Sequence, residues 1–235
     1  VKSSDIINTY NLNIMKLNHS NINAEDPIEL LEKIRSTSGI KITQGLSDDV
    51  ITRFIHSNKE LVIAIERAAT QKSILKNEDK NFLNLDERTQ IETTQAGFTN
   101  FYDQSTVNPY VSLAACGPWI ITTKGAVIYD CGGYGMLGFG HAPDFILDAM
   151  NQNHVMANIM TPNISQMRLN TALRNEIGQV NGECPFSKFL CMNSGSEANS
   201  VASRIIDINT KNKTEAGEKH YGKKICGITL KGSFH

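Results

Sequence analysis

Two short polar segments near the end of the chain contain residue types that can bind an anion and an aromatic ring. The first, Asn193-Ser194-Gly195-Ser196, directly precedes a helical pattern. Free backbone N–H groups and the helix dipole favour an anion there, glycine allows a phosphate to approach closely, and Ser196 adds a hydroxyl. We expect a phosphate-binding loop. The alternative is that Ser194 is only a helix cap, with Glu197 as its capping-box partner.

The second segment is Gly232-Ser233-Phe234-His235, which supplies an aromatic ring and an imidazole. A planar cofactor whose phosphate lies on the first loop could stack its ring against Phe234. A lone phenylalanine after a strand is more often a core residue, and that alternative stays open. The conjunction of the two segments is what favours a binding site.

A predicted strand-helix-strand unit must position these two loops. Phe189-Leu190-Cys191-Met192 and the run from Ile225 to Leu230 have the length and apolarity of strands, and Glu197 to about Ile208 is helical in pattern. Such a unit predicts two parallel strands with a right-handed crossover, hence an α/β sheet covered by helices. Both loops then open at the same sheet edge, where ligands bind in such folds.

Three blocks in order resemble a known family. They are Asn193-Ser194-Gly195-Ser196-Glu197-Ala198-Asn199, the end Lys231-Gly232-Ser233-Phe234-His235, and an earlier passage that runs from Gly125 through Asp130, Gly133-Tyr134-Gly135 and Gly138-Phe139-Gly140-His141 to Pro143. Together they are similar to class III aminotransferases, which are pyridoxal-phosphate enzymes of fold type I. Pro143 follows His141 by two residues, where the family often has three. The resemblance spans about Trp119 to His235 and implies part of an α/β three-layer sandwich.

The resemblance also implies roles for individual residues. Gly195 and Ser196, with Ser194 beside them, would bind the phosphate of pyridoxal 5'-phosphate. Phe234 would stack on the pyridine ring, with His235 next to it. Tyr134 falls where several family members place an aromatic residue of the substrate pocket, and a buried structural tyrosine is an equal alternative.

The implied reaction moves an amino group from an amino acid or amine to a 2-oxo acid. In the family the Schiff-base lysine and the carboxylate that faces the pyridinium nitrogen lie beyond the aromatic loop, and Lys223, Lys224 and Lys231 match neither role. The resemblance therefore implies the N-terminal part of a homodimeric enzyme, inactive as a fragment. The same half-chain would fit an aminomutase, racemase or decarboxylase of the family, or a non-catalytic relative.

A competing motif is Gly133-Tyr134-Gly135-Met136-Leu137-Gly138, which fits the G-x-G-x-x-G pattern of NAD(P)-binding dehydrogenases. In that class a helix opens at the loop, and an acidic residue follows about twenty residues later. Here the next expected helix starts at Pro143, and 151–158 holds no Asp or Glu. We therefore rank the dehydrogenase below the aminotransferase.

The first 96 residues are predicted to form a polar arm of about twenty residues and a helical extension, ahead of the aminotransferase-like region 97–235. One helix is expected from Asp26 and Pro27 until Gly39, a longer one from Ser47 through Ile65, and helical patches follow to residue 96. Their apolar stripes indicate core or docking faces, without recognisable chemistry.

Beyond residue 97 the pattern predicts smaller elements. Trp119–Thr122 and Ala126–Tyr129 flank Thr123-Lys124-Gly125 as a hairpin. A helix is expected at Pro143 and another capped by Ser165. For His141, in the Gly-His passage, we expect a turn or packing role.

Composition places this chemistry in an ordinary globular chain. The 235 residues carry 23 Lys+Arg against 24 Asp+Glu, a formal net charge of -1, which argues against a broad nucleic-acid interface. Five cysteines without a C-x-x-C pair indicate reduced thiols, with neither a disulfide framework nor a metal site. No run is long and apolar enough to cross a bilayer. We expect a cytoplasmic enzyme that acts on small molecules.

Overall fold

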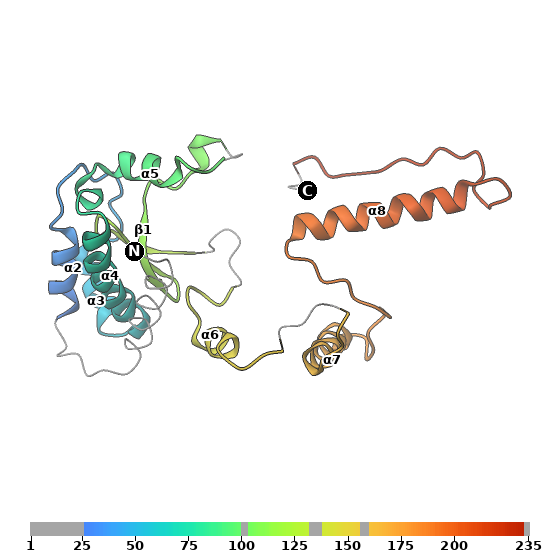
Figure 1. The fold of residues 1–235 in the computed structure, drawn as a ribbon, viewed down its shortest axis with the longest axis horizontal. Coiled ribbons are helices and arrows are strands. Elements are labelled where there is room, and N and C mark those ends of the chain that lie inside the picture. Colours follow the sequence, from blue (N-terminus) through green and yellow to red (C-terminus); the bar gives the residue numbers. More distant parts are fainter. Residues whose placement is uncertain (1–25, 100–102, 132–137, 156–159, 233–235) are drawn as a thin grey trace. The chain divides into compact units, whose positions relative to one another are not determined.

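The computed structural model describes residues 26–99, 103–131, 138–155 and 160–232. These residues fall into two compact units, one that ends at Asn153 and one that begins at His154 (Figure 1). The first unit holds α2 (Pro27–Arg35), α3 (Asp48–Ile55), α4 (Lys59–Glu78), the 3-10 turn η1 (Phe82–Asn84), α5 (Glu87–Gln95), the 3-10 turn η2 (Gln104–Thr106), β1 (Ser112–Cys116), β2 (Trp119–Thr122), β3 (Val127–Tyr129) and α6 (Asp144–Met150). The second unit holds α7 (Ile164–Gly178) and α8 (Gly195–Thr214).

Helix α2 begins as the sequence predicts, but it ends earlier. The Asp26 side chain accepts a hydrogen bond from the Ile28 amide at 2.9 Å, and Pro27 occupies the first turn. The helix stops at Arg35, so the prediction that Gly39 terminates it was wrong. Gly39 has a φ of +88°, and a Cβ there would lie 2.5 Å from the Leu85 carbonyl oxygen. Glycine is needed at this position for the close approach of two chain segments.

The single long helix expected after Ser47 is in fact two helices, α3 and α4, separated at residues 56–58. Asn58 takes an extended conformation, and its side-chain oxygen accepts hydrogen bonds from the Leu61 amide and from the indole nitrogen of Trp119, each at 3.1 Å. The break therefore caps α4 and also provides a partner for a buried tryptophan. This tertiary requirement overrides the helical periodicity of the sequence.

The predicted hairpin is confirmed as β2 and β3. Trp119 pairs with Tyr129 and Ile121 with Val127 in antiparallel register, and the Gly125 amide closes the turn onto the Thr122 carbonyl at 2.9 Å. Strand β1 adds to the other side of β2, also antiparallel, which gives a three-stranded sheet in the order β1-β2-β3. Helix α6 begins directly after Pro143, as predicted.

The core of the first unit lies between this sheet and the helices. Helix α4 packs against β1 and β2, and α2 packs against α4 (Figure 1). The apolar stripes of the N-terminal third are thus core faces. The buried cluster comprises Leu31, Ile34, Ile51, Leu61, Ala64, Ile65, Ala68, Cys116, Trp119, Ile121 and Val127. This core contains residues from both sides of position 97, the boundary suggested by the sequence.

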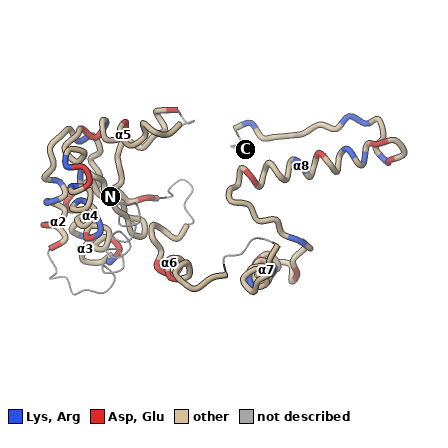
Figure 2. The backbone as a smooth tube through the Cα atoms, viewed as in Figure 1, with Lys and Arg blue, Asp and Glu red and all other residues tan. Residues whose placement is uncertain are grey.

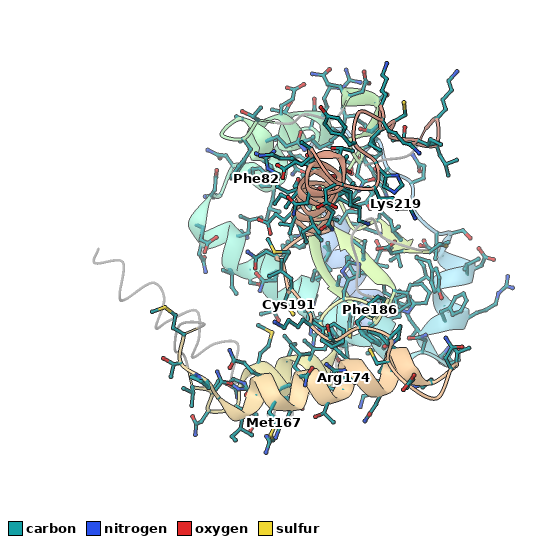
Figure 3. All side chains as sticks on the ribbon, turned by 90° about the vertical axis from the view of Figure 1, so that its right-hand side faces the viewer. Phe82, Met167, Arg174, Phe186, Cys191 and Lys219 are labelled. Atoms are coloured by element: carbon teal, nitrogen blue, oxygen red, sulfur yellow. The ribbon has the colours of Figure 1, made fainter. Side chains whose placement is uncertain are left out.

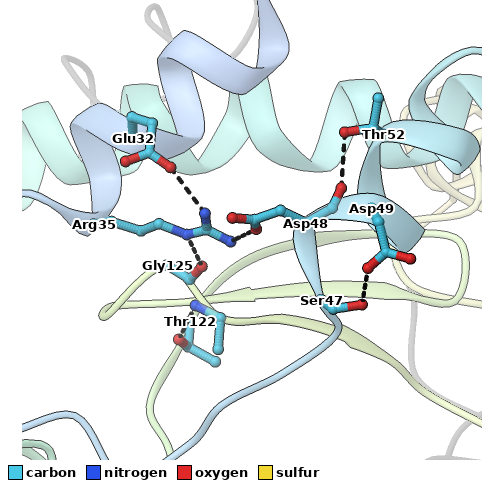
Figure 4. Close-up of polar contacts among 9 residues, drawn as sticks. Glu32, Arg35, Ser47, Asp48, Asp49, Thr52, Thr122 and Gly125 are labelled. Carbon is cyan, nitrogen blue, oxygen red and sulfur yellow. Dashed lines mark hydrogen bonds and ion pairs between the residues drawn. The ribbon is translucent and has the colours of Figure 1, made fainter.

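Arg35 links three parts of the first unit (Figure 4). Its guanidinium donates to the Gly125 carbonyl at 3.2 Å, to Glu32 Oε1 at 2.9 Å and to Asp48 Oδ1 at 2.8 Å. Burial alone would lower the pKa of Arg35, but the hydrogen bonds to Asp48 and Glu32 outweigh it and raise the pKa above its ordinary value. The hairpin turn is thereby bound to the end of α2 and the start of α3.

In the second unit, α7 is capped two residues earlier in the sequence than expected. The predicted cap, Ser165, was wrong, because Asn163 and Gln166 form a reciprocal capping box with both hydrogen bonds at 3.1 Å. Arg174 of α7 anchors the segment that follows. It donates to the carbonyls of Phe186 and Ser187 at 3.0 and 2.7 Å, and Figure 3 shows that segment passing along the helix.

The two predicted strands of this unit do not form. Residues 189–192 and 225–230 are neither strand nor helix, and the sheet of the described chain is antiparallel and lies in the first unit. The expected parallel strand-helix-strand pair was therefore wrong for this structure. A strand requires a hydrogen-bonded neighbour, and the described residues of the second unit provide none. Apolar side chains of both runs accordingly stay exposed, with Leu190 at 66 % and Ile228 at 95 %.

The helices of the first unit carry charges of both signs. Figure 2 shows Lys and Arg intermingled with Asp and Glu along α2, α3 and α4. Within the described ranges, no helix combines the length and the apolarity needed to cross a membrane.

Candidate functional site

The predicted phosphate loop lies at the start of α8, the 20-residue helix of the second unit. Ser194 takes an extended conformation with φ of -147°, and its hydroxyl oxygen accepts a hydrogen bond from the Glu197 amide at 3.2 Å. It is therefore the N-cap of α8, the role named as the alternative for this residue. The helix also begins at Gly195, two residues earlier than the sequence pattern indicated.

Glu197 supports the loop in a different way from a standard capping box. Its Oε2 accepts a hydrogen bond from the Asn193 amide at 2.9 Å, one residue before the N-cap. Together with the Ser194 cap, this bond fixes both sides of the turn that leads into the helix. The carboxylate also occupies the first turn, where it interacts favourably with the helix dipole and competes with any incoming anion.

The amides of Gly195 and Ser196 are the donors that this arrangement leaves for a ligand. The first N–H groups of a helix have no intrahelical acceptor, and both residues are exposed. Their carbonyls are engaged instead, since Asn199 Nδ2 donates to Gly195 at 3.1 Å and the Ser200 hydroxyl donates to Ser196 at 3.0 Å. The described loop can thus offer two amides and the Ser196 hydroxyl to an anion.

The other predicted site residues fall outside the described part of the chain. Phe234, His235 and Tyr134 belong to 233–235 and 132–137, so their predicted roles stay predictions. The described chain approaches the aromatic loop as far as Gly232, whose φ is +83°. In Figure 1 the segment after residue 222 runs back along α8 toward the end where that helix begins.

His141 has a partner that the sequence did not reveal. Its Nε2 lies 3.2 Å from Asp130 Oδ2, and its backbone pairs with Gly117. The expectation for His141 was a turn or packing role. The Asp130–His141 spacing alone gives no signal for the pair, because residues 131–140 separate them.

The remaining reactive groups provide little chemistry. Burial raises the pKa of the Cys116 thiol, so less of the nucleophilic thiolate is present at neutral pH. In the parts of the chain that the structure describes, no three His, Cys, Asp or Glu side chains gather as metal ligands. The described portion of the competing glycine motif is Gly138, and the next helix among the described residues after it begins at Asp144.

Comparisons of the chain with family models, with curated proteins and with solved structures find no match.

Proposed function

We propose that the chain is the N-terminal part of a pyridoxal-phosphate-dependent class III aminotransferase that transfers an amino group from an amino acid or amine to a 2-oxo acid. The observation that carries the proposal is the start of α8, where Ser194 caps the helix and the amides of Gly195 and Ser196 face solvent. These residues form the central block of the family resemblance.

The described residues fit the phosphate of the cofactor. Two backbone amides, one hydroxyl and the positive end of a 20-residue helix dipole supply directed donors and a favourable field for a dianion. Gly195 presents no side chain, so a phosphate oxygen can approach the backbone. The Ser194 hydroxyl accepts from the Glu197 amide, and the Glu197 carboxylate accepts from the Asn193 amide, which holds the loop in place. The amides of the two residues at the helix start, Gly195 and Ser196, are left for the ligand.

The cofactor supplies the electron sink for carbanion chemistry when it is bound. In the proposed enzyme this chain orients it: Gly195 and Ser196 fix the phosphate, Phe234 restricts the ring by stacking, and His235 lies beside it. Tyr134 shapes the pocket for the substrate. The lysine that moves the proton is not assigned to any residue of this chain.

Substitution of Ser196 tests the proposal in the full-length protein. We expect Ser196→Ala to weaken pyridoxal-phosphate binding by about tenfold or more, because a hydrogen bond to a charged oxygen is lost. Phe234→Ala should weaken it as well. Ser200→Ala is the matched control, since this hydroxyl lies one turn further along α8 and donates to a backbone carbonyl. Unchanged affinity in the first two variants, measured by equilibrium titration, would overturn the assignment.

A further inference from the structure

A groove lies between the last turns of α8 and the segment that follows this helix. Its volume is about 240 Å³. Helix α8 contributes Ile206, Thr210 and Lys213 to its lining, and the following segment contributes His220 and Ile225. The groove is therefore built within the second unit alone.

Hydrogen bonds fix the chain on both sides of this groove. The His220 amide donates to the Lys213 carbonyl at 3.1 Å, which joins the helix to the following segment directly. The Lys223 amide donates to the His220 carbonyl at 3.0 Å, so the chain turns again before Ile225. These bonds form the groove before a ligand arrives, which lowers the ordering cost of binding.

Two isoleucines give the groove an apolar part. Ile206 is 62 % exposed and Ile225 is 54 % exposed, so both present apolar surface to solvent. An aliphatic chain that covers this surface removes it from water, which is favourable. Pockets for drug-sized ligands usually have volumes of about 300–1,000 Å³, so this groove is suited to a smaller molecule.

The polar part of the groove carries positive charge. Between positions 209 and 225, five lysines stand against two glutamates. Lys211 and Lys213 lie in the last turn of α8, where they offset the partial negative charge of the helix end. Lys211 pairs with Glu215 at 3.9 Å, whereas Lys213 forms no ion pair with the described residues. The Lys213 ammonium can therefore meet an anionic group, next to the imidazole of His220.

We propose that this groove binds a small aliphatic monocarboxylate. The aliphatic chain lies against Ile206 and Ile225, and the carboxylate meets Lys213 and His220. The groove lies at the opposite end of α8 from the predicted phosphate loop, roughly 25 Å away along the helix. The site does not depend on the proposed aminotransferase function.

A titration of the whole chain with hexanoate, followed by the amide resonances, tests the proposal. Saturable shifts are expected at Lys213, His220 and Ile225. Binding of 1-hexanol should be about two- to fivefold weaker, because it lacks the charge that Lys213 meets. Acetate should bind roughly tenfold more weakly or less, because it lacks most of the chain. No saturable shift at these residues, or equal affinity for hexanoate and 1-hexanol, would overturn the proposal.

Variants of exposed residues identify the groups responsible. Lys213→Gln should weaken hexanoate binding by about two- to fivefold and leave 1-hexanol binding unchanged. Ile225→Ala should weaken the binding of both by about twofold or more. Lys223→Gln is the matched control, because it removes the same charge from the same segment outside the lining and should leave the affinity unchanged. Equal losses in Lys213→Gln and Lys223→Gln would mean general attraction of anions and would contradict the site.

Discussion

Single polar side chains attach the hairpin turn to the helices of the first unit. Arg35 donates to the Gly125 carbonyl, and Lys124 donates to the carbonyls of Ser38 and Leu83. The Lys124 side chain is buried, although it lies in the hairpin turn. Neither contact could be predicted from the sequence, because each joins residues at least 41 positions apart.

Replacement of Gly125 tests how tightly the turn is packed. Gly125 has a φ of +72°, and an added Cβ would lie 2.5 Å from Arg35 Cγ. We expect Gly125→Ala to lower the free energy of unfolding by about 2–4 kcal/mol, from backbone strain and steric overlap combined. Gly138→Ala is the control, since φ is +74° there and no atom of the described residues lies within 4 Å. Its loss should be only about 1 kcal/mol. Equal losses in urea unfolding would contradict the close packing.

Lys124 gives a prediction about pH. Burial lowers the pKa of Lys124, and the carboxylates of Asp86 and Glu87 oppose this shift without cancelling it. Between the folded and the ordinary pKa the unfolded chain binds more protons, so the contribution of Lys124 to stability rises with pH through that alkaline window. The free energy of unfolding of the wild type, measured relative to that of Lys124→Met, should therefore increase as the pH rises. A difference between the two proteins that stays constant would show that the pKa is not lowered.

At the scale of elements, local signals predicted some boundaries and tertiary contacts set the others. The starts of α2 and α6 and the β2–β3 hairpin follow from Asp26, Pro143 and the Thr123-Lys124-Gly125 turn. The break before α4 does not, because Asn58 is fixed by Trp119 from a distant strand. The run 225–230 has strand composition but no partner strand among the described residues, and composition alone cannot supply one.

Substitutions of apolar residues distinguish helices that stabilise the fold through burial from helices that do not. Leu61 of α4 is fully buried, so Leu61→Ala should lower the free energy of unfolding by about 2–5 kcal/mol through lost burial and a cavity. Ile206 of α8 is 62 % exposed, and Ile206→Ala should change it by less than about 0.5 kcal/mol. Chemical denaturation of both variants checks the contrast. Equal losses would mean that α8 is packed in solution.

At the scale of the whole molecule, the two units differ in how much they bury. The first has a continuous core of helix and sheet residues. In the described part of the second, Gly178 is the only buried residue, and α7 and α8 expose large apolar side chains such as Met167 and Ile206. The sequence correctly predicted a helix directly after the 193–196 segment, and the role of this segment as a phosphate loop stays a prediction. It also predicted two parallel strands beside α8 that would bring the aromatic loop to this helix start, and the described residues do not form them.

A titration of the protein with pyridoxal phosphate tests most directly whether the start of α8 binds the cofactor, when the amide resonances of the second unit and the phosphorus resonance of the ligand are followed. We predict that the largest amide shifts occur at Gly195 and Ser196, together with a change in the phosphorus resonance, and that Ser196→Ala reduces both. The opposite result would be binding that leaves residues 194–197 unshifted, or no binding at all. Either outcome would remove the start of α8 as the cofactor site.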